Sequence, residues 1–116
     1  EITKKVLQNN PRPDAIFCSN DMVALGAYKA ITEAGLKVGK DIGLIGNDNE
    51  FSYEGLPIKI TSVKFKAYEA GAKAAEILIS IIEGDNLKKK NTVVLVPYLL
   101  IRESTGETFK SIKMTK

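Results

Sequence analysis

Two short polar clusters in this sequence carry side chains that can bind a ligand rich in hydroxyl groups. Each cluster directly follows an apolar run, at 15–18 in one case and at 42–46 in the other. An asparagine amide donates and accepts hydrogen bonds, and an ionised aspartate accepts at two oxygens. Such a set can hold vicinal hydroxyls, so it suits a sugar or a similar small polyol. The clusters are Ser19-Asn20-Asp21 and Asn47-Asp48-Asn49.

Both clusters also have a plainer interpretation. Asn20 and Asp21 can cap the helix that follows them, because these residue types are favoured at a helix start. Asn47, Asp48 and Asn49 can form a turn, since Asn and Asp tolerate turn conformations. From the residues alone, the ligand-binding and the structural interpretations both stay open.

The elements that would position the two clusters alternate between strand and helix. The apolar runs at 15–18 and 42–46 are typical of buried strands, and helical spacing of apolar residues runs between them from Met22 to Ala34. Gly35 follows as the expected left-handed residue after the helix. A connection of this length allows the two strands to pair in parallel. Ligands of such sheets bind beyond the carboxyl ends of the strands, where both clusters lie.

The rest of the chain continues this alternation. The pattern predicts a strand at 59–64, a helix with an apolar face at 66–83, a strand at 93–96, and another strand at 98–102. The fold class is therefore α/β, with a mostly parallel sheet flanked by helices.

The composition argues against several classes of protein. The net charge is +3, from 17 basic and 14 acidic residues, which is too mild for a nucleic-acid-binding module. The run 88–90 of three lysines is interpreted as a solvated loop. The single cysteine, Cys18, cannot form an internal disulfide and is expected to be a buried core thiol. Without histidine, no His-dependent triad exists and a zinc site is not expected.

Sequence features typical of membrane proteins and of nucleotide-binding enzymes are absent as well. No apolar run reaches the ~20 residues needed to cross a membrane, so no membrane partner is expected. Neither G-x-G-x-x-G nor a P-loop is present to suggest a nucleotide-binding enzyme. We therefore expect no catalytic residues, no metal and no cofactor. The start of the chain looks like the middle of a helix and not like a signal peptide, which suggests a fragment.

Four segments resemble motifs of LacI/GalR-type transcriptional repressors. Residues 13–27 (PDAIFCSNDMVALGA) resemble the family segment "PxAIfxxND.mAlGa", and residues 41–48 (DIGLIGND) resemble its "DisviGyDd" strand. Residues 60–63 (ITSV) resemble "LTTV", and residues 98–105 (YLLIREST) resemble the terminal "LivReST". The four motifs lie in the family's order and together span most of the chain.

The resemblance implies a periplasmic-binding-protein-like (type I) effector domain of two α/β lobes with a small-molecule effector between them. Residues 1–65 would belong to the C-terminal lobe, and 66–97 would supply a helix and a strand to the N-terminal lobe. Residues 98–116 would return to the C-terminal lobe and form the tail. The domain would be incomplete, and binding to operator DNA would require a head domain absent from this chain.

The resemblance also assigns ligand-binding residues. The family's effector-contacting Asn and Asp map onto Asn20 and Asp48. Two departures bear on which sugar is bound, and both positions are candidates for ligand contact. Asn47 replaces the usual aromatic residue of "GyD", and Phe65 stands where many members have Gln.

The family's dimer contacts map onto Leu25 and Leu56, for which ordinary core packing is the alternative. The chain is thus predicted to be the sugar-sensing effector domain of a bacterial, cytoplasmic, homodimeric transcriptional regulator, and not an enzyme. The alternative is a periplasmic sugar-binding protein of a transporter, although such proteins usually lack the "RxST" ending. The upstream sequence would separate these two functions.

Overall fold

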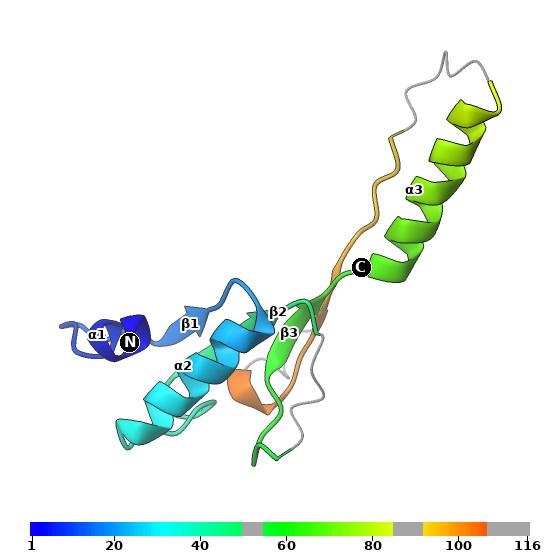
Figure 1. The fold of residues 1–116 in the computed structure, drawn as a ribbon. Coiled ribbons are helices and arrows are strands. Elements are labelled where there is room, and N and C mark those ends of the chain that lie inside the picture. The colour runs from blue at the N-terminus through cyan, green and yellow to red at the C-terminus, as the bar shows by residue number, and fades with distance from the viewer. Residues whose placement is uncertain (50–54, 85–91, 107–116) are drawn as a thin grey trace. The chain divides into compact units, whose positions relative to one another are not determined.

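The chain folds into two compact units, which are described separately. The computed structural model describes residues 1–49, 55–84 and 92–106 (Figure 1). Unit 1 comprises Glu1–Lys64 and Leu99–Lys116, and unit 2 comprises Phe65–Tyr98. The assignment of 1–65, 66–97 and 98–116 to the two lobes of an effector domain stays a prediction.

A sheet of four strands, in the order β1-β2-β3-β4, is the framework of the fold. The first three strands pair in parallel, with Phe17 opposite Ile45 and Ile45 opposite Thr61. Their bounds are β1 Ala15–Phe17, β2 Gly43–Asn47 and β3 Thr61–Lys64, and β4 spans Tyr98–Leu100. The predicted α/β class with a mostly parallel sheet is confirmed. Two helices, α1 (Ile2–Val6) and α2 (Asp21–Glu33), and a 3-10 turn, η1 (Glu103–Thr105), accompany the strands.

Helix α2 packs on β2 through a face of small and aliphatic residues (Figure 1). Its buried residues recur every three or four positions, which is the spacing of one helical face. Alanines on this face let the helix approach the sheet closely. The core cluster consists of Cys18, Ala24, Ala27, Ile31, Ile42, Leu44 and Ile60. Burial raises the pKa of the Cys18 thiol, as expected for a core cysteine.

Gly35 ends α2 in the predicted way. Its φ is +76°, in the left-handed region that glycine adopts without strain. The Gly35 N–H donates to the carbonyl of Thr32 at 3.0 Å, and the Leu36 N–H donates to the carbonyl of Ile31 at 3.1 Å. This pair of bonds is the Schellman motif, which satisfies carbonyls that the last helical turn leaves open.

Residues 92–97 form no regular element, so the predicted strand at 93–96 is wrong. Its valines favour a strand, but they are exposed, Val94 to 80%. An extended segment needs a partner strand, and the described part of the chain offers none to these residues. The next strand, predicted at 98–102, ends at Leu100.

Unit 2 contains α3 (Ala67–Ile82), the helix predicted at 66–83. None of its side chains is buried within the described structure, and Ile82 is 74% exposed. Leu78, Ile79 and Ile81 are exposed as well. A groove of about 350 Å³ is lined by Ala70, Lys73, Ala74, Ile77, Thr92, Val93 and Leu95. An apolar surface of this kind is uncommon on a soluble monomer.

We expect the 116-residue chain, produced by itself, to self-associate through α3. Replacing both Leu78 and Ile82 with Glu should shift it toward monomer, because these positions are one helical turn apart and burying two carboxylates is unfavourable. The control is Gln8→Glu with Asn9→Glu, which adds the same charge at exposed polar positions of unit 1. Sedimentation velocity measures the association state of each chain. A wild-type chain that is monomeric at all concentrations would contradict the expectation.

Candidate ligand-binding site

The two polar clusters follow adjacent parallel strands. Asn20 comes after β1, and Asp48 comes directly after β2. The Asp48 N–H donates to the carbonyl of Val63 in β3 at 2.8 Å. Because the strands are parallel and paired in register, their carboxyl ends meet at one edge of the sheet. The structure therefore brings both clusters to the edge at which ligands of α/β sheets bind.

Asn20 caps α2 through its side-chain oxygen. Its backbone is extended, with φ −155°, and Oδ1 accepts from the Val23 N–H at 2.9 Å. The structural interpretation is therefore correct for the oxygen. Within the described residues the amide nitrogen, Nδ2, has no hydrogen-bond partner. That nitrogen is available as a donor on a half-buried side chain.

The residues after β2 form a bend, here called the turn, with unusual backbone angles. Asp48 has φ +95° and Asn49 has φ +52°. Positive φ is uncommon for residues other than glycine, although Asp and Asn adopt it more readily than other residue types. Asn47 ends β2 and Asp48 lies at a bend, as the structural interpretation requires in part, and the Asp48 side chain is half-buried. Asn47 donates from Nδ2 to Oδ1 of Asp48 at 2.8 Å, which orients this carboxylate.

Beneath this turn lies a set of hydrogen bonds that sequence reasoning missed. Asp21 is 1% exposed and accepts from the Ser62 hydroxyl at 2.8 Å. The same hydroxyl accepts from the Asn49 N–H at 3.1 Å. Arg102 donates from Nη2 to Oδ1 of Asn49 at 2.6 Å and from Nη1 to the Ile60 carbonyl at 2.7 Å. The position of Arg102 in the terminal motif was the available signal, but its partner lies 53 residues away.

The rest of the terminal motif fastens the chain to the sheet. The Ser104 hydroxyl is buried, accepts from the Thr61 N–H at 2.7 Å and donates to the Leu44 carbonyl at 2.5 Å. The hydroxyls of Thr61 and Thr105 lie 2.9 Å apart. These contacts join β2, β3 and η1, so this segment stabilises the sheet beside the candidate site.

Three other predicted residues have different surroundings. Phe65 is half-exposed and is the first residue of unit 2, so its ligand contact stays a prediction. Leu56 packs against the core cluster, as the core-packing alternative requires. Leu25 is 39% exposed on α2, and Met22 on the same helix is exposed as well. Of the two predicted dimer residues, Leu25 is therefore the better candidate.

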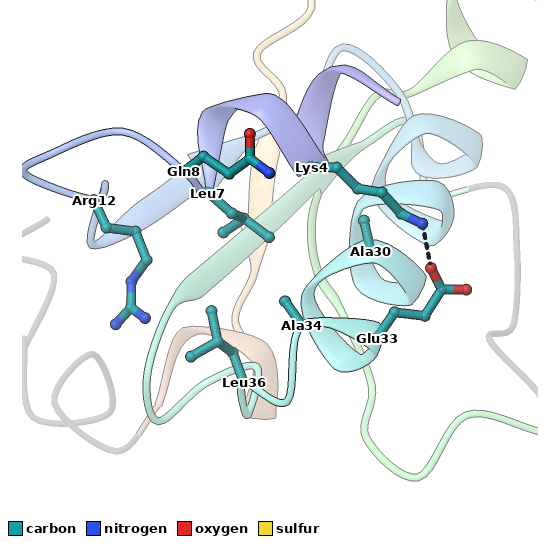
Figure 2. Close-up of a pocket in the computed structure, with 8 residues that line it drawn as sticks. All are labelled: Lys4, Leu7, Gln8, Arg12, Ala30, Glu33, Ala34 and Leu36. Carbon is teal, nitrogen blue, oxygen red and sulfur yellow. Dashed lines mark ion pairs between the residues drawn. The ribbon is translucent and has the colours of Figure 1, made fainter.

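A surface hollow of about 360 Å³ lies between α1 and the C-terminal half of α2 (Figure 2). At its rim Lys4 Nζ pairs with Glu33 Oε2 at 2.7 Å, and this contact lowers the pKa of Glu33. The lining residues are Lys4, Leu7, Gln8, Arg12, Ala30, Glu33, Ala34 and Leu36, which include no predicted site residue. We therefore assign the candidate site to the sheet edge and not to this hollow.

The described residues contain neither a metal-binding group of side chains nor a membrane-spanning helix. Among residues 1–49, 55–84 and 92–106, no three or more Cys, Asp and Glu side chains are grouped so that they could hold a metal ion. In the same ranges, no helix has the length and apolar character needed to span a bilayer.

Comparison with known families agrees with this geometry. The model of the periplasmic binding protein-like domain matches residues 2–105. The chain belongs to this family. Its candidate site therefore occupies the carboxyl edge of a sheet in a periplasmic binding protein-like fold.

Relatives of this periplasmic binding protein-like chain are transcriptional repressors. It is 33% identical over 109 residues to the arabinose metabolism transcriptional repressor of Geobacillus stearothermophilus, covering 92% of this chain and 30% of that protein. It is 36% identical over 104 residues to the HTH-type transcriptional repressor PurR of Mannheimia succiniciproducens, covering 90% and 31%. The chain thus spans about a third of the length of these relatives.

Solved structures of the same type are similar. The Lac repressor dimer bound to operator and the anti-inducer ONPF gives a TM-score of 0.76 at 30% identity, covering 90% of this chain and 31% of that one. A LacI family transcriptional regulator from Bifidobacterium animalis subsp. lactis gives 0.83 at 28% identity, covering 90% and 38%. The resemblance to LacI-type repressors is confirmed, and these relatives agree with the prediction that the chain is not an enzyme.

We expect mutation to separate the capping role of the Asn20 side-chain oxygen from the role of its amide nitrogen. Asn20→Ala should lower the free energy of unfolding by about 1 kcal/mol, because the cap is lost. Asn20→Asp should keep the stability, since a carboxylate oxygen still accepts from the Val23 N–H and suits a helix N-terminus. Urea denaturation measures both, with the exposed neighbour Ser19→Ala as control. Equal losses in the two Asn20 variants would contradict the capping geometry.

Proposed function

We propose that this chain is part of the ligand-sensing effector domain of a bacterial transcriptional regulator, and that its effector is a sugar or a sugar derivative. The observation that carries the proposal is the polar edge of the sheet, where Asn20 and Asp48 follow adjacent parallel strands. The names of similar proteins mention arabinose, ribose and cellobiose, which supports the same class of ligand. The whole protein would act in the cytoplasm on operator DNA.

The chemistry of the two side chains suits a pair of neighbouring hydroxyl groups. The Asp48 carboxylate accepts from one hydroxyl, and the amide nitrogen of Asn20 donates to another. Asn47 takes part by fixing the Asp48 carboxylate through their 2.8 Å hydrogen bond. Phe65 is proposed to contact the same ligand, on the strength of its position after the motif at 60–63.

Regulation would follow from differential binding. A sugar that binds one arrangement of two lobes more tightly than another shifts the protein toward that arrangement. In a dimer this change would alter the spacing of two DNA-binding heads. The alternative of a transporter's sugar-binding protein is not favoured, because the relatives named above are repressors.

The ligand assignment predicts a specific loss on changing Asp48. In the full-length protein, Asp48→Asn should weaken sugar binding by about 1.5–3 kcal/mol, because a charged acceptor becomes a neutral amide. Asn tolerates the positive φ at this position, whereas Ala would add about 1–2 kcal/mol of backbone strain. Asn20→Asp should also weaken binding, since it removes the amide donor.

Isothermal titration calorimetry with L-arabinose, D-ribose and cellobiose measures these effects. The matched control is Asp14→Asn, the same change at an exposed site before β1. A sugar that binds the wild type and the Asp48→Asn variant equally well would refute the assignment.

The proposal includes a homodimer that uses the exposed side of α2. Leu25→Glu in the full-length protein should shift the dimer toward monomer, because an interface would bury an unpaired charge. Leu56 is unsuited to this test, since it packs on the core. Ile2→Glu is the control, because it makes the same kind of change at an exposed position of α1. Sedimentation equilibrium distinguishes the variants, and an unaltered dimer in Leu25→Glu would argue against this interface.

A further inference from the structure

The turn after β2 holds two successive residues in a backbone conformation that is uncommon outside glycine. Asp48 and Asn49 have φ values of +95° and +52°, and neither residue is glycine. Such conformations persist where the surrounding structure over-determines them. The direction of the Asp48 carboxylate depends on these angles, so the groups that fix the turn also determine where this carboxylate points.

Three hydrogen bonds hold the turn from outside it. The Asp48 N–H donates to Val63 and the Asn49 N–H donates to the Ser62 hydroxyl, at 2.8 and 3.1 Å. The Arg102 guanidinium donates to the side chain of Asn49 at 2.6 Å. The main chain and the side chain of Asn49 are therefore held by two different segments of the protein.

The two groups that bind Asn49, the Ser62 hydroxyl and the Arg102 guanidinium, are themselves hydrogen-bonded to other residues. Ser62 is fully buried, and its hydroxyl proton is directed to Asp21 at 2.8 Å, which leaves its oxygen to accept from Asn49. Arg102 uses its second terminal nitrogen on the Ile60 carbonyl at 2.7 Å. A planar guanidinium with one nitrogen fixed in this way has little freedom to move the other. The Thr61 hydroxyl also accepts from the Arg102 N–H at 2.8 Å.

We propose that Arg102 and Ser62 are positioning residues for the ligand site. They fix the left-handed turn and so set the direction of the Asp48 carboxylate, without contributing a ligand contact of their own. The effect on affinity rests on the proposed function, whereas the effect on the turn does not. The competing explanation is that Arg102 only fastens the C-terminal segment to the sheet.

The first experiment measures the turn in the full-length protein without any ligand. Hydrogen–deuterium exchange of a peptide spanning 47–49 should become about tenfold faster in Arg102→Ala, because a charge-assisted hydrogen bond to the turn is lost. Thr105→Val is the matched control, since it breaks contacts of the same C-terminal segment, to the Thr61 hydroxyl and the Arg102 carbonyl, and leaves the Arg102 guanidinium in place. If Arg102→Ala does not fold, Arg102→Lys replaces it, because lysine lacks the planar fork whose two terminal nitrogens bind Ile60 and Asn49 separately.

Unchanged exchange at 47–49 in these Arg102 variants would overturn the proposal. So would equal acceleration in Thr105→Val, because the effect would then be a general loss of stability. Asn49→Asp should leave exchange near the wild-type rate, since it keeps an acceptor for Arg102 and tolerates positive φ. Asn49→Ala should accelerate exchange, and combining it with Arg102→Ala should add little, because both changes remove the same bond.

The second experiment tests the consequence for binding by calorimetry with L-arabinose, D-ribose and cellobiose. For a sugar that Asp48→Asn weakens, Arg102→Ala should weaken binding about tenfold, whereas Asn49→Asp should keep nearly full affinity and Thr105→Val should have no effect. Wild-type affinity in Arg102→Ala would overturn the positioning role while the proposed function stands. If Asp48→Asn alters binding of none of the three, the proposed function fails, and exchange at 47–49 still decides whether Arg102 fixes the turn.

Discussion

The Asp21 carboxyl group is almost completely withdrawn from water, at 1% exposure, and a buried carboxyl group must have hydrogen-bond donors. One donor is the Ser62 hydroxyl, which at the same time accepts from the Asn49 N–H. This requirement connects the start of α2, strand β3 and the turn after β2. Arg102 extends the connection to the C-terminal segment. Much of the geometry of the candidate site follows from satisfying these buried polar groups.

The same residues serve the fold and the site, which explains why two interpretations of each cluster were possible. Asn20 caps α2 with its oxygen and leaves its nitrogen available at the sheet edge. Asp48 and Asn49 form a bend at the end of β2, and this bend is held from β3 and from Arg102. A turn needed only to leave a strand would be easier to build with glycine. Asp and Asn also adopt positive φ, and unlike glycine they bring polar side chains to this edge of the sheet.

Local signals in the sequence predicted the elements around the site well. Apolar runs marked β1 and β2, and Asn20 and Gly35 marked both ends of α2, because caps act on neighbouring residues. The valines at 93–96 led to a wrong prediction of a strand, because strand formation depends on a partner strand that local sequence does not reveal. The bonds of Arg102 to Ile60 and Asn49 were also not predicted, because they join residues 42 and 53 positions apart. Leu56 packs on the core from a half-buried position, so its predicted dimer contact stays a prediction.

Asn20 and Asp48 are proposed to hold a sugar at the carboxyl edge of the sheet. The most direct test is a crystal structure of the full-length protein with whichever of L-arabinose, D-ribose and cellobiose it binds most tightly. We expect sugar hydroxyls within hydrogen-bond distance of the Asn20 amide nitrogen and the Asp48 carboxylate. A sugar bound in the hollow beside the Lys4–Glu33 ion pair, with no contact to Asn20 or Asp48, would contradict this assignment.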